Sequence, residues 1–211
     1  MDKILIRKII ASLNAVALLF MQVLCGVSIS LLIPKAVFAS VNCGQTTTSG
    51  TAQVINVVVT RWSPCTTGAN TLGYTVVSAN VYIGAVGAGK LYMSIYTNSS
   101  SVPSVPICTD TTGQNPVGTS VNSDVLSGCG TLAASTIYWV GWQASDPTTA
   151  DIYNLTTCPD GIYSQYNNST VAGTWPNPAA VTGSAGACFT AYLILNAITT
   201  TAKSAPAGMM Q

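Results

Sequence analysis

The chain contains no glutamate, and charged residues make up only 6% of its 211 positions. The solvent-exposed side of a helix normally carries Glu, Lys and Arg, because these residues have high helix propensity and pair at i,i+4 spacing. Thr, Val and Tyr suit a pleated, half-buried surface, whereas Gly, Asn, Ser and Pro suit turns. A chain built mainly from this second group is therefore predicted to fold as an all-β protein.

The first 39 residues have the pattern of a targeting segment. Three basic residues within positions 1–8 precede an apolar stretch over 9–34, and Val37-Phe38-Ala39 fits a signal-peptidase site before Ser40. The stretch is also long enough to span a bilayer, so two interpretations stay open: a cleaved signal peptide or an uncleaved signal anchor. Both place residues 40–211 outside the cytoplasm, because the positive charge is denser on the N-terminal side.

Six cysteines follow this leader, and an even number in an exported domain indicates a disulfide framework. Zinc is not favoured, because the chain has no histidine and no C-x-x-C pair. Six cysteines allow 15 pairings, and the sequence does not decide between them. Our hypothesis is sequential pairing, which closes three short loops that each stabilise the fold by about 3 kcal/mol. The pairs are Cys43–Cys65, Cys108–Cys129 and Cys158–Cys188.

Alternating apolar and polar residues predict several strands within a domain spanning 40–198, followed by a flexible tail over 199–211. One face of the second strand carries Val77, Ala79, Val81 and Ile83, and Asn98–Pro106 is predicted to be a loop because it is polar and proline-rich. Met93 and Ile95 share one face of the third strand, and Leu193 and Leu195 share one face of the last. Short strands separated by turn residues are typical of a sandwich or a barrel. The predicted strands are 52–62, 74–83, 91–96, 117–126, 136–144 and 187–197.

Two of these segments also resemble a known module. The sequences LYMSIYTN at 91–98 and LAASTIYW at 132–139, with a proline-bearing loop after the first, are similar to a jelly-roll module of secreted bacterial and phage surface proteins. Ser135 stands where that pattern usually has glycine. The resemblance implies a jelly-roll-like antiparallel β-sandwich, akin to carbohydrate-binding modules, and by analogy the binding of carbohydrate or a surface structure.

Catalytic groups are scarce. The absence of histidine excludes Ser-His nucleophilic catalysis, and none of the five aspartates beyond the leader lies in a recognisable glycosidase signature. Those five face only three basic residues, a formal charge of −2, so no basic patch is available for nucleic acid. The sequence therefore predicts a protein that is not an enzyme and does not bind nucleic acid.

We predict no cofactor and no metal site; calcium is the alternative that the aspartates allow. Asp146, Asp151 and Asp160, with Asn154 and loop carbonyls, supply the oxygen ligands that calcium prefers. No EF-hand pattern is present, and solvated or turn-capping aspartates are the alternative interpretation.

Aromatic residues are the main candidates for ligand contact. Residues 136–144 carry bulky side chains on both faces, and other rings lie opposite the predicted core faces or in the long connection 145–185. Rings with a polar edge can stack on sugars or anchor an interface; alternatively, loops cover them or they form cross-strand pairs. The candidates are Tyr82, Tyr92, Tyr96, Trp142, Tyr153, Tyr163, Tyr166 and Trp175.

The sequence thus predicts a secreted or surface-exposed, non-enzymatic module that binds a glycan or a surface protein. The alternative is a structural subunit that assembles with copies of itself into a surface layer, fibre or appendage. Low charge and high Thr, Ser and Ala content suit packing between copies. Contact with a membrane is expected only through an uncleaved leader.

Overall fold

The computed structural model of the chain divides into two compact units, Met1–Val37 and Phe38–Gln211. It describes residues 40–48, 51–54, 60–86, 89–145, 150–155, 158, 161–168 and 171–200, and for 51–54, 85–86 and 150–155 it describes the backbone only. The leader over 1–39 and the tail beyond residue 200 lie outside the described residues. Within the described part no helix is long and apolar enough to cross a membrane.

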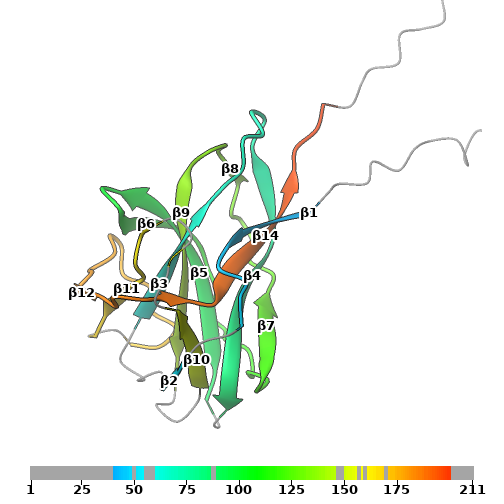
Figure 1. Cartoon of the computed structure of the whole chain (residues 1–211). Helices are drawn as coiled ribbons and strands as arrows, with labels where there is room; N and C mark the ends of the chain where they lie inside the picture. Colours follow the sequence, from blue (N-terminus) through cyan, green and yellow to red (C-terminus); the bar gives the residue numbers. More distant parts are fainter. Residues whose placement is uncertain are drawn as a thin grey trace, which may run out of the picture. The chain divides into compact units, whose positions relative to one another are not determined.

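Two antiparallel sheets pack as a sandwich (Figure 1), which confirms the all-β prediction. The eight-stranded sheet has the order β1 (Ser40–Gly44), β14 (Ala191–Ala197), β4 (Tyr74–Val86), β10 (Ala150–Leu155) and β13 (Cys188–Phe189), with β2 (Thr51–Val54) on β10, and β7 (Ser120–Asp124) and β8 (Thr131–Leu132) on β4. The six-stranded sheet has the order β12 (Gly183–Ser184), β11 (Gln165–Asn167), β3 (Thr60–Thr66), β9 (Ile137–Ala144), β5 (Leu91–Ser99) and β6 (Val102–Thr109).

The main core lies between the two sheets and follows the alternation of the strands. Met93 and Ile95 of β5 belong to the same core as Leu193 and Leu195 of β14 in the opposite sheet, and all four side chains are fully buried. Burying such a side chain stabilises the fold by about 1.5–3 kcal/mol. The sequence pattern therefore assigned the inward faces of these two strands correctly.

Strand β4 departs from the predicted alternation at Val77. Ile194 pairs with Ser78 but Leu195 pairs with Val76, so one extra residue is inserted in β4 at this point. Such a bulge shifts every side chain before it to the other face. Val77, predicted to face the core, is consequently 38% exposed, whereas Tyr74 joins the core at 4% exposure.

The predicted loop Asn98–Pro106 is wrong, because most of it is strand. Strand β5 continues to Ser99, and β6 returns beside it after a turn in which Ser100 and Ser101 have φ of 51° and 62°. Strand β6 is an edge strand, and proline is tolerated at a sheet edge because its missing N–H removes no ladder bond there.

The three disulfides have the predicted sequential pairing. The bond between Cys43 and Cys65 joins β1 of the eight-stranded sheet to β3 of the six-stranded sheet. The bond between Cys108 and Cys129 joins β6 to the segment before β8. Three disulfides are compatible with an oxidising, extracellular environment.

Removing the inter-sheet disulfide should lower stability without changing the fold. We expect the double substitution Cys43→Ala and Cys65→Ala to reduce the free energy of unfolding by about 3 kcal/mol. Without the bond, the unfolded chain regains the conformational entropy of a loop of about 20 residues. Urea denaturation under non-reducing conditions measures this. Val125→Ala, at a side chain that is 79% exposed, is the control and should change stability by less than about 0.5 kcal/mol. An unchanged midpoint in the double variant would contradict the assignment.

Candidate functional site

The outer side of the six-stranded sheet is closed by a second apolar cluster. Trp62, Tyr96 and Trp139, which we call the covered cluster, are all fully buried on the side of this sheet that faces away from the main core. Residues 171–182, the covering segment, pack over them (Figure 1, yellow to orange). The rings of Trp62 and Tyr96 meet edge to face, with centroids 5.6 Å apart. This side of the sandwich is therefore packed rather than open.

Polar groups along the covering segment fasten it to the sheet. The Tyr96 hydroxyl donates to the carbonyl of Pro176 at 2.8 Å, and the Trp175 indole donates to the carbonyl of Asp110 at 2.7 Å. The Gln143 side chain donates to Thr174 and accepts from the backbone N–H of Gly173. Burial raises the pKa of Tyr96 well above its ordinary value, so this phenol stays a neutral donor.

Two of the candidate aromatic residues are fully buried. Tyr96 belongs to the covered cluster, and Trp142 faces the main core, where its ring meets Phe189 edge to face at 5.4 Å. Residues of β9 alternate between the two clusters, with Tyr138, Val140 and Trp142 inward and Trp139 outward. The predicted bulk on both faces of this strand is confirmed, but these two rings offer a ligand no surface in this structure.

The remaining candidates are spread over the domain. Tyr163 is 46% exposed in the segment before β11, and Tyr82, Tyr92, Tyr166 and Trp175 are half-buried. Tyr92 and Trp175 come close together, because the Tyr92 ring contacts Gly113 and Gly173. The side chain of Tyr153 lies outside the described residues.

Tyr166 lies beside Arg61, the one arginine of residues 40–211. Arg61 pairs with Tyr166 in register, and its guanidinium lies 6.0 Å from the Tyr166 ring and 4.8 Å from the Phe189 ring. Burial lowers the pKa of Arg61 from its ordinary value, but the group stays protonated. Tyr166 thus contributes to packing around a half-buried cation.

The outer side of the eight-stranded sheet is accessible where β14, β4 and β7 lie together. Tyr82 and Tyr192 project there as half-buried rings, and Val77 and Val121 are 38% and 37% exposed. Exposed Ser123 completes this group, and all five side chains are uncharged. We call this surface the open face; it consists of Val77, Tyr82, Val121, Ser123 and Tyr192.

The sheet register fixes the spacing of groups on the open face. Tyr82 lies directly opposite Val121, and Asn80 lies opposite both Ser123 and Tyr192. The two tyrosines are therefore diagonal neighbours on adjacent strands, a spacing at which aromatic side chains can reach the same partner. Burial raises the pKa of Tyr192 above its ordinary value, so its hydroxyl remains a donor at neutral pH.

A small polar cavity of about 220 Å³ lies at the turn after β6. Its walls are residues 109–112 and 124–127, so Asp110 and Asp124 both line it. Burial, followed by the negative charge of Asp110, raises the pKa of Asp124 to about 6. This pair could not be predicted from the sequence, because the two residues come from distant segments and neither has a local motif.

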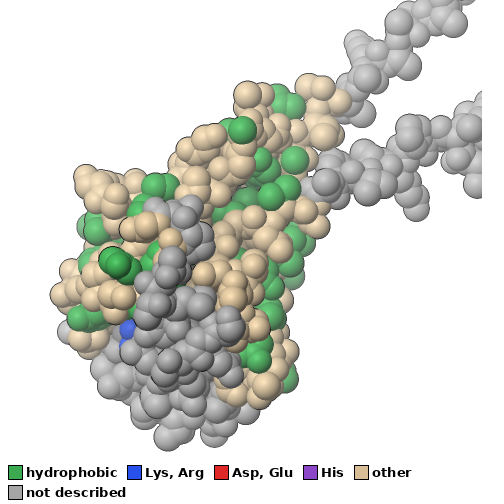
Figure 2. Space-filling model, viewed as in Figure 1, with side chains coloured by type: hydrophobic (Ala, Val, Ile, Leu, Met, Phe, Trp, Pro, Cys, Tyr) green, Lys and Arg blue, Asp and Glu red, His purple; other side chains and the backbone are tan. Residues whose placement is uncertain are grey.

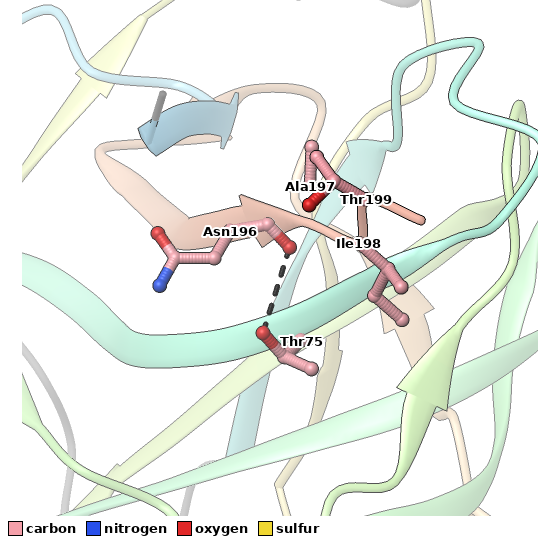
Figure 3. Close-up of a pocket in the computed structure, with 5 residues that line it drawn as sticks. All are labelled: Thr75, Asn196, Ala197, Ile198 and Thr199. Atoms are coloured by element: carbon pink, nitrogen blue, oxygen red, sulfur yellow. Dashed lines mark hydrogen bonds between the residues drawn. The ribbon is translucent and has the colours of Figure 1, made fainter. Parts of the chain in front are cut away.

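Two other hollows are described, and both are lined by uncharged residues. A cavity of about 290 Å³ where the chain leaves β14 is lined by Thr75, Asn196, Ala197, Ile198 and Thr199, and Thr75 donates to the carbonyl of Asn196 at 3.5 Å (Figure 3). A wider hollow of about 470 Å³ lies between the ends of β5 and β9. No Asp, Lys or Arg side chain lines either hollow, so neither offers a charged group to a ligand.

The calcium prediction lies largely outside the described part of the chain. Asp146 and Asp160 are not described, and only the backbone of Asp151 and Asn154 is. Among the residues whose side chains are described, no group of three or more His, Cys, Asp or Glu could hold a metal ion. The proposed calcium ligands therefore stay a prediction from the sequence.

Comparison with known proteins adds no relative. The sequence matches no protein-family model, and no curated protein matches it. The resemblance to the jelly-roll module therefore remains a prediction from its two segments, and any functional argument depends on the geometry of this chain alone.

Trp139 should be a main support of the covering segment. It is fully buried, and its indole donates to the Asn98 side chain at 2.9 Å. We expect Trp139→Ala to lower the free energy of unfolding by about 3–5 kcal/mol, because it leaves a large cavity. Urea denaturation gives this value, with Tyr163→Ala at an exposed tyrosine as the control, expected within about 0.5 kcal/mol of the parent. A loss below about 1 kcal/mol in Trp139→Ala would show that the covering segment does not depend on this ring.

Proposed function

We propose that this protein is an exported, non-enzymatic recognition module that binds an uncharged, hydroxyl-rich partner, most simply a glycan, through the open face. The observation that carries the proposal is the pair Tyr82 and Tyr192, which lie on one accessible sheet surface among uncharged side chains. Exported location is supported by the three disulfides together with the N-terminal targeting pattern.

The chemistry of the open face suits sugars. A tyrosine ring provides an apolar surface for the C–H face of a pyranose, and its hydroxyl provides a donor and acceptor at the edge. The amide of Asn80 is fully buried and already bonded to Ser78 and to the carbonyl of Tyr192. Asn80 also accepts from the Ser123 hydroxyl at 2.5 Å, so these polar groups hold the strand surface together, and the faces of the two tyrosine rings are the surface we expect a ligand to contact.

Charge supports the same class of partner. Figure 2 shows one face of the molecule, on which hydrophobic side chains are scattered among polar ones and basic or acidic colour is scarce in the described part. Exported residues carry three basic and five acidic groups in total. Such a surface gives little long-range attraction for an ionic partner, so recognition would depend on stacking and hydrogen bonds.

A second candidate function is self-assembly through the same surface. Val77 and Val121 are partly exposed beside the two tyrosines, and an uncharged sheet face with exposed apolar groups can pack against a second copy. This observation favours a structural subunit of a larger surface assembly as the alternative.

Binding to a broad glycan array tests the first proposal. We expect the exported domain, residues 40–211, to bind selectively, and Tyr82→Ala and Tyr192→Ala each to weaken binding at least about tenfold, which corresponds to about 1.4 kcal/mol of lost stacking. Tyr163→Ala, which removes an exposed ring elsewhere, is the matched control and should bind normally. If both open-face variants fold and bind as tightly as the parent, this surface is not the ligand site.

Light scattering after size-exclusion chromatography tests the alternative. Assembly through the open face predicts large particles that dissociate when Val121→Lys places a charge in the contact, because burying an unpaired charge is costly. Val125→Lys, on an exposed side chain beyond the end of β7, should leave the particles intact. A monomer at high concentration would rule out self-assembly by this face.

A further inference from the structure

Two carboxyl groups from opposite sheets face one small cavity. Asp110 directly follows β6 of the six-stranded sheet, whereas Asp124 ends β7 of the eight-stranded sheet. Both line the polar cavity at the turn 109–112. The Cys108–Cys129 disulfide joins the end of β6, two residues before Asp110, to the segment that follows β7, so a covalent link holds the two walls of the cavity together.

The two carboxyl groups differ in their hydrogen-bond partners. Asp110 accepts through both oxygens, from the backbone N–H of Thr112 at 2.7 Å and of Gly113 at 3.0–3.1 Å. The Oδ2 atom of Asp124, by contrast, is buried and has no hydrogen-bond partner among the described residues. A buried carboxylate oxygen without a donor, in a cavity that a second aspartate also lines, is stabilised when it binds a proton.

We propose that Asp110 and Asp124 share one proton, held on Asp124, and that this pair acts as a proton-dependent clasp between the two sheets. Loss of the proton leaves two like charges in one cavity in place of a charge-assisted hydrogen bond. The clasp is independent of the ligand proposed above, since neither residue belongs to the open face.

The clasp also connects to the covering segment. The carbonyl of Asp110 accepts the indole N–H of Trp175 at 2.7 Å, and the backbone N–H of Asp110 donates to Met93 of β5. Weakening the pair therefore loosens the turn that anchors the covering segment. Of the other ionisable groups described around this turn, Lys90 is exposed and reaches the carbonyl of Gly113 at 3.4 Å, and Tyr92 contacts the same glycine.

The direction of the pH effect follows from the raised pKa of Asp124, about 6 against an ordinary value of 3.8. The folded protein then binds this proton more tightly than the unfolded chain does. The stabilisation is complete below about pH 4 and is lost as the pH rises through about 6, the reverse of an ion-paired aspartate.

Carboxyl carbon chemical shifts of the full chain, titrated in EDTA, test the shared proton directly. We expect Asp124 to titrate near pH 6 and the thermal midpoint to fall by about 3–6 °C between about pH 4 and pH 7.5. Asp124→Asn should fold and lose most of this slope, because its amide donates to Asp110 in place of the proton. Asp160→Asn is the control and should keep the slope.

Two results would overturn the clasp: an Asp124 carboxyl that titrates near pH 4, or an Asp124→Asn variant with the parent slope. Hydrogen exchange of the amides of Thr112 and Gly113 gives a local reading, since both donate to Asp110. After correction for intrinsic rates, their exchange should be faster above about pH 7 in the parent and independent of pH in Asp124→Asn. Unchanged protection in the parent would also contradict the proposal.

Discussion

Strand β9 carries large apolar side chains on both of its faces, and the arrangement of the domain follows from burying both. Trp142 and Val140 point into the space between the sheets, while Trp139 points away from it. An exposed indole on a sheet surface would lose several kcal/mol of burial. Residues 171–182 lie across the outer side of the six-stranded sheet and bury this ring. Hydrogen bonds of Tyr96 and Trp175 hold the segment in place. The long connection that looks like a recognition loop in the sequence is therefore, in large part, a second core.

This use of the long connection leaves the two sides of the sandwich unequal. The outer side of the six-stranded sheet is occupied, and its half-buried Tyr92 and Tyr166 lie against Gly173 and Arg61. Tyr82 and Tyr192 are also half-buried, but they lie on the other sheet. The number of aromatic residues in the sequence therefore does not predict a ligand-binding surface, since most of the large aromatic side chains are buried in the two cores. What distinguishes Tyr82 and Tyr192 is that their rings remain accessible on a rigid sheet without a covering segment in the described part of the chain.

The sequence was sufficient for features set by local pattern and insufficient for those set by contacts between distant segments. Alternation assigned the inward faces of β5 and β14, and short loop closure favoured the sequential disulfides. The bulge at Val77 depends on how β14 pairs with β4, and Pro103 and Pro106 are tolerated only because β6 is an edge strand. Tyr96 and Trp142 looked alike in sequence, yet one lies under the covering segment and the other in the main core. The Asp110–Asp124 pair needs both sheets to bring its members together, so no single segment could reveal it.

Because the chain has few charged residues, each ionisable group contributes a large share of the electrostatic free energy. In a protein whose surface carries many carboxylates, one shared proton would be a minor part of the electrostatic free energy. Here residues 40–211 contain five aspartates, and two of them line one cavity. The same scarcity that keeps the open face uncharged leaves no described cation beside Asp124 to neutralise it, since Lys90 reaches only the far side of the turn at Gly113. A proton is then the available counter-charge, and its binding links the acidity of the surroundings to the contact that holds the two sheets and the covering segment together.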